Sequence, residues 1–197
     1  MGGAKYRAKG ERKVKPILFL FGDGESESTY FNDLSNMLKG RRIRVCSTEV
    51  TGPERILKKC RGRELTGEIR RDRGDEVCII TDFDGRYSEN ELMKFQKECD
   101  SENYQLFMSN ISFEIWLLMH FKQLNHPYTQ EELEKELSDC LGRKYDKVKG
   151  IPFDPEDLEM AIIHASERLK NYDNLECLRK NPSTTVHFLI DRIRNFE

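Results

Sequence analysis

Apolar residues along the chain fall into short runs or alternations and into longer stretches with a helical repeat. Four of the short segments predict strands, over 17–21, 41–50, 77–80 and 104–110. A helical stretch follows each of them, with Ser26, Pro53, Ser88 and Ser112 expected at the N-cap or in the first turn. Strands that alternate with helices through short connections favour a parallel sheet. The pattern therefore predicts a mainly parallel, Rossmann-like α/β fold with flanking helices.

The part of the chain after Asn125 shows no clear strand pattern. Helical spacing recurs there over 129–141, 154–170 and 184–196. We therefore expect an α/β domain over 16–125 and a helical C-terminal subdomain over 126–197 that packs on it. Residues 1–15 hold six basic residues and one acid, which predicts a mobile basic arm that could contact nucleic acid or a partner.

Composition narrows the class of protein. Hydrophobic residues make up 37% of the chain and charged residues 35%, a balance that indicates a folded protein with a heavily charged surface. No apolar stretch approaches the length of a membrane-spanning helix, and no apolar segment follows the basic start as in a signal peptide. The six cysteines show no CxxC pair and no zinc spacing. We therefore expect a cytoplasmic protein with free thiols and no membrane partner.

Acidic residues stand close to the ends of three predicted strands. Asp82 and Asp84 close the third strand, and Asp23 follows the first strand between two glycines. Glu114 lies in the first turn of the helix after the fourth strand. In a parallel sheet these side chains lie along one edge, where they would repel one another without a cation. Mg²⁺ or Mn²⁺ prefers such oxygen ligands, so the pattern predicts a metal site of Asp23, Asp82 and Asp84. Glu114 is a further catalytic candidate.

A purely structural interpretation of the same residues stays open. Asp82, Gly85 and Ser88 are also typical of a turn followed by a helix cap. Glu114 would be favoured by the dipole at a helix N-terminus without any active site. The second acidic strand end favours the metal site, because the glycines on both sides of Asp23 leave the backbone free to approach a ligand.

Four segments in this order resemble the RloB family, whose members carry a Toprim-like domain. They are GDGESESTYF, IITDFDGR, SNISFEIWLLMHF and NPSTTVHFL. The resemblance implies a parallel α/β fold that binds magnesium through an acid after the first strand and a DxD pair after the third. It places Asp82 and Asp84 as the DxD pair and Asp23 where the family usually has glutamate. Aspartate is one methylene shorter, and Glu27 is a candidate to compensate for it.

The resemblance also carries an expected biological setting. RloB-like genes are associated with restriction, abortive-infection and phage-defence loci, often beside an ATPase. Toprim domains serve in enzymes that act on phosphodiesters. The resemblance therefore implies a metal-dependent nuclease that acts on DNA or RNA in phage defence, with an ATPase as a possible partner.

Further residues are candidates for contact with the substrate. Ser183 and Thr184 stand at a predicted helix start, where amides and hydroxyls could bind a phosphate or simply cap the helix. Lys144 and Lys147 flank a tyrosine and could hold a nucleic-acid backbone, although a solvated loop is the other interpretation. The clusters KGRRIR and KKCRGR could likewise form a basic surface or a solvated face.

Three functions are consistent with this pattern. The first is the metal-dependent endonuclease or phosphodiesterase. The second is a catalytically weak or inactive Toprim-like module that binds nucleic acid or an ATPase partner, which the aspartate at position 23 favours. The third is a haloacid-dehalogenase-like phosphatase, in which Asp82 would be the nucleophile and Asp84 the acid–base. No later acidic pair at a strand end completes the magnesium site of such a phosphatase.

Overall fold

The structure is a computed structural model of the chain. It describes residues 15–22, 24–40, 42–47, 52–72, 74–85, 87–169 and 174–196. Of the basic arm predicted over 1–15, only Lys15 is among the described residues. Asp23 also lies outside the described residues.

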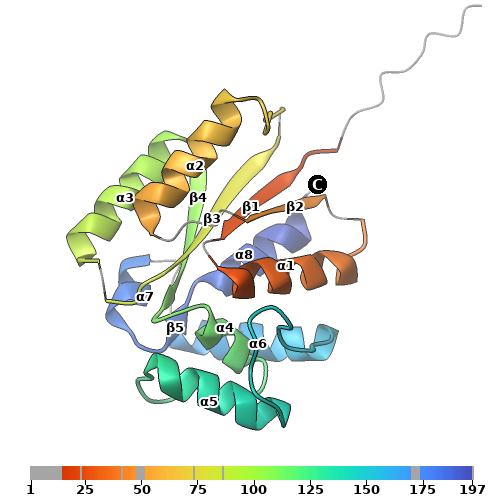
Figure 1. Cartoon of the computed structure of the whole chain (residues 1–197), viewed down its shortest axis with the longest axis vertical. Helices are drawn as coiled ribbons and strands as arrows, with labels where there is room; N and C mark the ends of the chain where they lie inside the picture. Colours follow the sequence, from red (N-terminus) through yellow and green to blue (C-terminus); the bar gives the residue numbers. More distant parts are fainter. Residues whose placement is uncertain are drawn as a thin grey trace, which may run out of the picture.

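A five-stranded sheet forms the centre of the described part of the protein (Figure 1). Its strands are β1 (Leu18–Gly22), β2 (Ile43–Ser47), β3 (Glu76–Asp82), β4 (Tyr104–Asn110) and β5 (Ser183–Thr184). The order across the sheet is β2-β1-β3-β4-β5, and β1 to β4 are parallel. The predicted mainly parallel α/β fold is confirmed.

β5 corrects the prediction that no strand follows Asn125. It is only two residues long and pairs antiparallel with the end of β4, with Ser109 opposite Thr184. Two residues cannot show a periodic pattern, so only pairing with β4 makes this segment a strand.

Eight helices are described. They are α1 (Glu25–Met37), α2 (Pro53–Leu65), α3 (Glu89–Ser101), α4 (Glu114–Met119), α5 (Gln130–Leu141), α6 (Pro155–Arg168), α7 (Asn174–Arg179) and α8 (Val186–Asn195). The sequence pattern treats 174–179 as a connection, but this segment forms α7. Six residues are too few to establish a helical repeat, so packing against β4 and α3 decides its structure.

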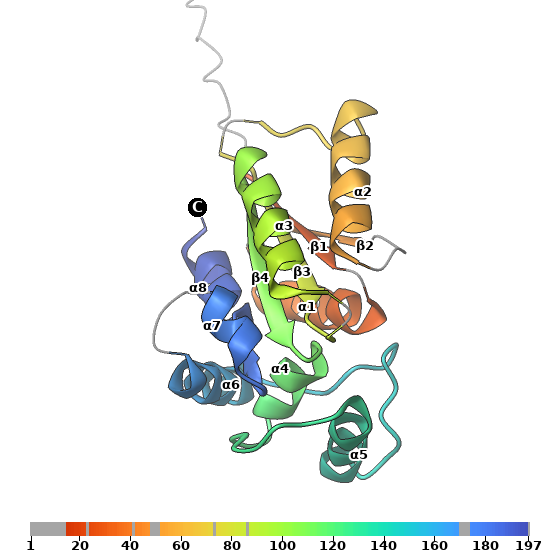
Figure 2. The ribbon, with the colours of Figure 1, turned by 90° about the vertical axis from the view of Figure 1, so that its left-hand side faces the viewer.

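The helices cover both faces of the sheet (Figures 1 and 2). Along β1, Leu18 and Leu20 join the apolar cluster that α1 and α8 cover and that continues into α4, α5 and α6. Phe19 and Phe21 join the cluster that α2, α3 and α7 cover. Side chains of a strand alternate between faces, so a strand buried on both faces reads as one continuous apolar run.

The first apolar cluster extends across the predicted boundary at residue 125. It contains Leu20 from the sheet together with Leu133, Leu158 and Ile190 from the C-terminal helices. The C-terminal helical region therefore shares its core with the sheet. The division into two subdomains stays a prediction.

The residues that cap the helices can be compared with the N-caps that the sequence predicts. Ser88 caps α3 and Thr129 caps α5, each in a capping box with the glutamate three residues on. The predicted cap at Ser26 is wrong: α1 begins after Gly24, and the Ser26 hydroxyl donates to Glu114 instead. The predicted cap at Ser112 is also wrong, because α4 begins after Phe113. The Ser26 hydroxyl donates to a buried carboxylate. A hydrogen bond to a charged acceptor is stronger than the neutral hydrogen bond by which a hydroxyl caps a backbone amide.

Within the described ranges, no helix is long and apolar enough to cross a membrane.

Candidate functional site

The topological switch point of the sheet lies between β1 and β3. These strands are neighbours, but the chain passes from β1 to β2 on one side and from β3 to β4 on the other. In such sheets, ligands bind beyond the carboxyl ends of the strands at this point. β1 ends at Gly22 and β3 ends at Asp82, so Asp82 and Asp84 lie at this edge. Asp23, which directly follows Gly22, is outside the described residues.

Asp82 belongs to the face of the sheet that α1 covers. Ile80 lies in the cluster shared with α1, whereas Ile79 and Phe83 pack in the cluster shared with α2. Because successive side chains of a strand alternate between faces, Asp82 shares the face of Ile80. Asp82 is half-buried and Asp84 is exposed.

Glu27, in the first turn of α1, lies against the backbone on both sides of position 23. Its side chain is buried, with 3% of the residue exposed. A Cβ placed at Gly22 would lie 2.8 Å from the Glu27 Cβ, and one placed at Gly24 would collide with the Glu27 carboxylate. The two glycines are therefore needed for the close approach of Glu27, which brings a further carboxylate to this edge of the sheet.

Glu114 is the first residue of α4 and is 2% exposed. Its Oε1 accepts a hydrogen bond from Ser26 Oγ at 2.8 Å and from the Tyr145 hydroxyl at 3.3 Å, and its Oε2 accepts one from Gln130 Nε2 at 3.3 Å. Burial by itself would raise the pKa of Glu114, but the Lys147 ammonium and the hydrogen bonds lower it overall. Glu114 is thus a buried, charged carboxylate that ties α4 to α1 and α5.

Lys147 places a positive charge near both Glu114 and Asp82. Its Nζ lies 3.4 Å from Glu114 Oε1, and its side chain is 47% exposed. Partial burial lowers the pKa of Lys147, but the charges of Glu114, Glu134 and Asp82 raise it overall. The carboxylate at the end of β3 and the buried Glu114 therefore lie in the field of the same cation.

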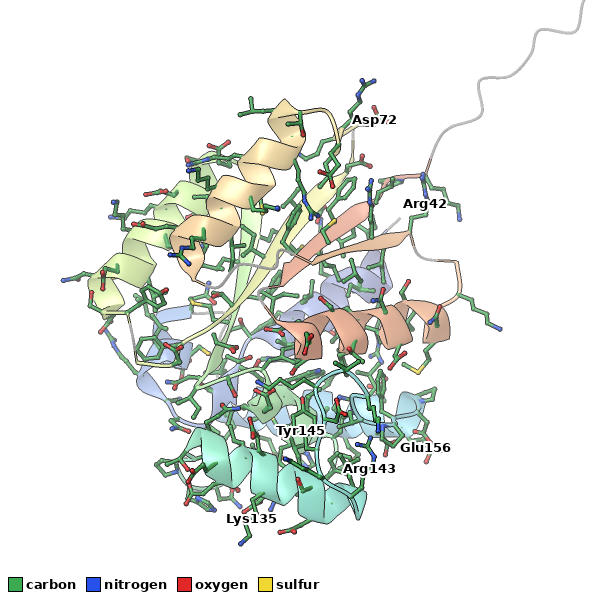
Figure 3. The ribbon with its side chains drawn as sticks, in the orientation of Figure 1. Arg42, Asp72, Lys135, Arg143, Tyr145 and Glu156 are labelled. Atoms are coloured by element: carbon green, nitrogen blue, oxygen red, sulfur yellow. The ribbon has the colours of Figure 1, made fainter. Side chains whose placement is uncertain are left out.

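Tyr145 connects Glu114 with Ser26 in the first turn of α1. Its hydroxyl lies 3.0 Å from Ser26 Oγ, in addition to the contact with Glu114. Burial raises the pKa of Tyr145, and the charges of Glu114 and Glu27 add to the increase. Figure 3 shows Tyr145 in the segment between α5 and α6, near the start of α4. We call Ser26, Glu114, Gln130, Tyr145 and Lys147 the Glu114 network.

The other predicted contact residues lie in different settings. Ser183 and Thr184 are fully buried, and their hydroxyls are used inside the protein. Ser183 Oγ donates to the Cys177 carbonyl at 2.8 Å, and Thr184 Oγ1 lies 2.9 Å from Ser109 Oγ. Lys144 is exposed on the segment that carries Lys147. A role in substrate binding stays a prediction for all of them.

Sequence reasoning missed two members of this arrangement. It assigned Ser26 to a helix cap, and it gave Gln130 no role. A Ser in a first turn is a normal capping signal, and Gln130 carries no motif. Only the packing of α5 beside α4 brings Gln130 to Glu114.

The predicted metal site consists of three aspartates, of which the described residues include Asp82 and Asp84. Across the described ranges, no three His, Cys, Asp or Glu side chains are grouped so that they could hold a metal ion. Asp82 and Asp84 supply two carboxylates near the end of one strand, and the third expected ligand, Asp23, is not among those residues. Hard oxygen donors of this kind fit Mg²⁺ or Mn²⁺, and the site stays a prediction.

Comparison with known proteins identifies the family. Searches of curated proteins and of solved structures found no match to the chain. The family model described as RloB-like protein matches residues 18–193. The match begins at the first residue of β1 and ends within α8, so it includes the whole sheet and the Glu114 network. The chain belongs to the RloB-like protein family.

Proposed function

We infer that this protein hydrolyses phosphodiester bonds in nucleic acid, with Mg²⁺ or Mn²⁺ held by Asp82, Asp84 and Asp23. One observation carries the proposal: Asp82 ends β3 at the switch point of the sheet, and its charge acts on Lys147, the cation that pairs with the buried Glu114. Membership of the RloB-like family supports it.

The donor set suits such a metal. Asp82 and Asp84 present carboxylate oxygens near the end of one strand, and waters and a substrate phosphate usually complete the shell of Mg²⁺. A bound divalent ion would supply charge neutralisation at the phosphate and a lower pKa for attacking water.

The residues of the chain itself would position the substrate. Lys147 is half exposed and its charge interacts with that of Asp82, so it could contact a phosphate oxygen of the substrate. Glu114 would hold Lys147 in position, because its carboxylate is fixed by Ser26 and Tyr145. In this proposal Glu114 is a positioning residue. Glu27 would support the backbone around Asp23.

The biological part of the proposal is phage defence with an ATPase partner. This part of the proposal rests on membership of the RloB-like family, and it names a class of partner, not one particular protein.

The test incubates end-labelled DNA and RNA with the protein in Mg²⁺, Mn²⁺ or EDTA, with and without a candidate ATPase partner. Wild type and the control Asp139→Asn, an exposed aspartate on α5, should cleave in a metal-dependent way. Asp82→Asn should lower cleavage at least about 100-fold, because misplaced metal ligands disrupt a tight catalytic geometry. Mg²⁺ should also raise the Tm of wild type and of the control but not of Asp82→Asn, since binding to the native state stabilises it.

Other outcomes would replace the proposal. Release of phosphate from a monoester without strand cleavage would identify a phosphatase. If no cleavage occurs under any condition, with or without the ATPase, the result would support the non-catalytic binding module.

A further inference from the structure

The outer face of α2 carries a basic hollow that the proposed site does not use. Its volume is about 440 Å³, and four of its lining side chains are Arg55, Lys58, Lys59 and Arg63. Gly62, Thr66 and Glu68 complete the lining. We call this hollow the α2 groove. The helix α2 that carries it packs over β1 at one side of the sheet (Figure 2).

Most of the positive charge in the groove has no counter-ion among the residues that the structure describes. Arg55, Lys58 and Lys59 form no ion pair with any other described residue, and only Arg63 is paired, with Glu68 at 3.4 Å. The three side chains are spaced i, i+3 and i+4 on one helical face, where each like-charge pair costs about 0.2–0.5 kcal/mol. An anionic partner would remove this repulsion.

The surrounding sequence concentrates the charge further. Residues 39–63 hold nine basic residues and two acids, in a chain whose net charge is −2. Two arginines border the core on this side: the guanidinium of Arg44 lies 5.9 Å from the Phe19 ring centre, and that of Arg63 lies 5.8 Å from the Phe21 ring centre. Contact with a ring holds each guanidinium in place at the border of the core.

The shape of the groove favours an extended polyanion. Beyond its own stretch of helix backbone, Gly62 has no described atom within 4 Å of the position that a Cβ would take, so it leaves an open depression in the last turn of α2. From Arg55 to Arg63 the helix rises about 12 Å. That length corresponds to about three or four phosphates of a strand at 3.4 Å each. The lining contains no aromatic side chain on which a base could stack, which favours contact with the backbone.

The groove also begins beside the candidate active site. α2 starts just after the carboxyl end of β2, at the sheet edge that carries Asp82. Gly52, at the start of α2, lies so close to the Tyr87 hydroxyl that a side chain at position 52 would collide with it. Tyr87 is three residues after Asp84. The loop that carries the acidic pair is therefore in contact with the first turn of the basic helix.

We propose that the α2 groove binds the sugar–phosphate backbone of a nucleic-acid strand and leads it to the carboxyl edge of the sheet. The inference rests on the proposed function for its direction toward Asp82. It assigns a sequence-independent binding surface, formed by Arg55, Lys58 and Lys59, that is separate from the metal ligands.

The experiment measures the binding of fluorescent DNA and RNA strands by anisotropy in EDTA, over a series of salt concentrations. Wild type is compared with Arg55→Ala/Lys58→Ala/Lys59→Ala. The matched control is Lys94→Ala/Lys97→Ala/Lys135→Ala, which removes the same charge from exposed positions on α3 and α5. Lys135 points away from the protein in Figure 3. The basic residues of 1–15 are common to all three proteins.

The groove variant should bind at least about 10-fold more weakly at moderate salt. Its plot of log K against log[salt] should lose about 2–3 units of slope, since each phosphate contact contributes about 0.7–0.9. A second variant, Gly62→Gln, keeps every charge but fills the depression, and it should also weaken binding. Strands of scrambled sequence should bind equally well.

Two patterns of results separate this inference from the proposed function. Loss of binding in the groove variant, with no cleavage by wild type, would support the groove and reject the nuclease. If wild type cleaves nucleic acid and the groove variant still binds as strongly as wild type, the groove proposal is overturned and the nuclease proposal stays in place. Equal loss in the groove variant and the control would also overturn it, because the effect would then be one of net charge alone.

Discussion

At the scale of single residues, the pair formed by Lys147 and Glu114 determines the electrostatics of the site. Glu114 is almost fully buried, and a buried carboxylate stays charged only if it is paired and hydrogen-bonded. Ser26, Gln130 and Lys147 meet this requirement together. Lys147 reaches Glu114 from solvent, so the charge that stabilises the carboxylate is also the charge that a substrate would meet.

Replacing Lys147 by alanine should lower the free energy of unfolding by about 1 kcal/mol at pH 7, because it leaves Glu114 buried without its cation while solvent screens half of the effect. The folded-state pKa of Glu114 is lowered, so its contribution to stability is present above the ordinary pKa of 4.5 and is lost as the pH falls below that value. Urea unfolding should therefore show the difference between variant and wild type shrinking below pH 4.5.

The control for this prediction is Lys144→Ala, at an exposed position on the same segment. It should change the free energy of unfolding by less than about 0.5 kcal/mol. An equal effect of the two substitutions at pH 7 would contradict an electrostatic role for Lys147.

At the scale of elements, two glycines have opposite reasons to be present. Gly22 ends β1 where the chain turns under α1, and the Glu27 Cβ occupies the space that a side chain would need. Gly62 lies inside α2 with open space around it, so the packing of the protein does not require a glycine there. A glycine inside a helix costs stability relative to alanine.

The same substitution should therefore have opposite effects at the two positions. Gly22→Ala should lower the free energy of unfolding by about 1–3 kcal/mol, because the added methyl group overpacks a buried contact. Gly62→Ala should raise it by about 0.5–1 kcal/mol. Thermal unfolding followed by circular dichroism measures both, and a shift of the same sign in the two variants would refute this account of the glycines.

At the scale of the whole molecule, two histidines make the fold sensitive to mild acid. Burial lowers the pKa of His120 to about 3 and that of His187 to about 4. Their pKa in the unfolded chain is near 6.5, so the unfolded state binds more protons once the pH falls below that value. The contribution of these two histidines to the free energy of unfolding is therefore fully present above pH 6.5. It decreases as the pH falls toward their pKa values in the folded state.

Between pH 6.5 and pH 5 the free energy of unfolding should approach a slope of about 1.4 kcal/mol per pH unit for each histidine. His187→Phe should remove about half of this slope, and urea unfolding at several pH values measures it. The control is His126→Phe, which removes an exposed histidine and shows how far the loss of any imidazole changes the slope. An unaltered slope in His187→Phe would show that this residue is protonated equally in both states.

The sequence by itself determined the order of the long elements and the parallel character of β1 to β4. A continuous apolar run such as 77–80 is typical of a strand in a sheet that helices cover on both faces. A cap such as Ser88 depends only on a residue three positions further along the chain. The positions of Asp82 and Asp84 at the end of β3 followed from the same local pattern.

Only the tertiary structure decided the contacts between distant segments. Ser26 and Glu114 are 88 residues apart and Ser26 and Tyr145 are 119 apart, and no local periodicity encodes such pairs. The short elements β5 and α7 depend in the same way on the strand or helix beside them. Local propensity fixes an element when its own side chains supply the stabilising contacts. A buried charge such as Glu114 needs partners that only the folded chain brings together.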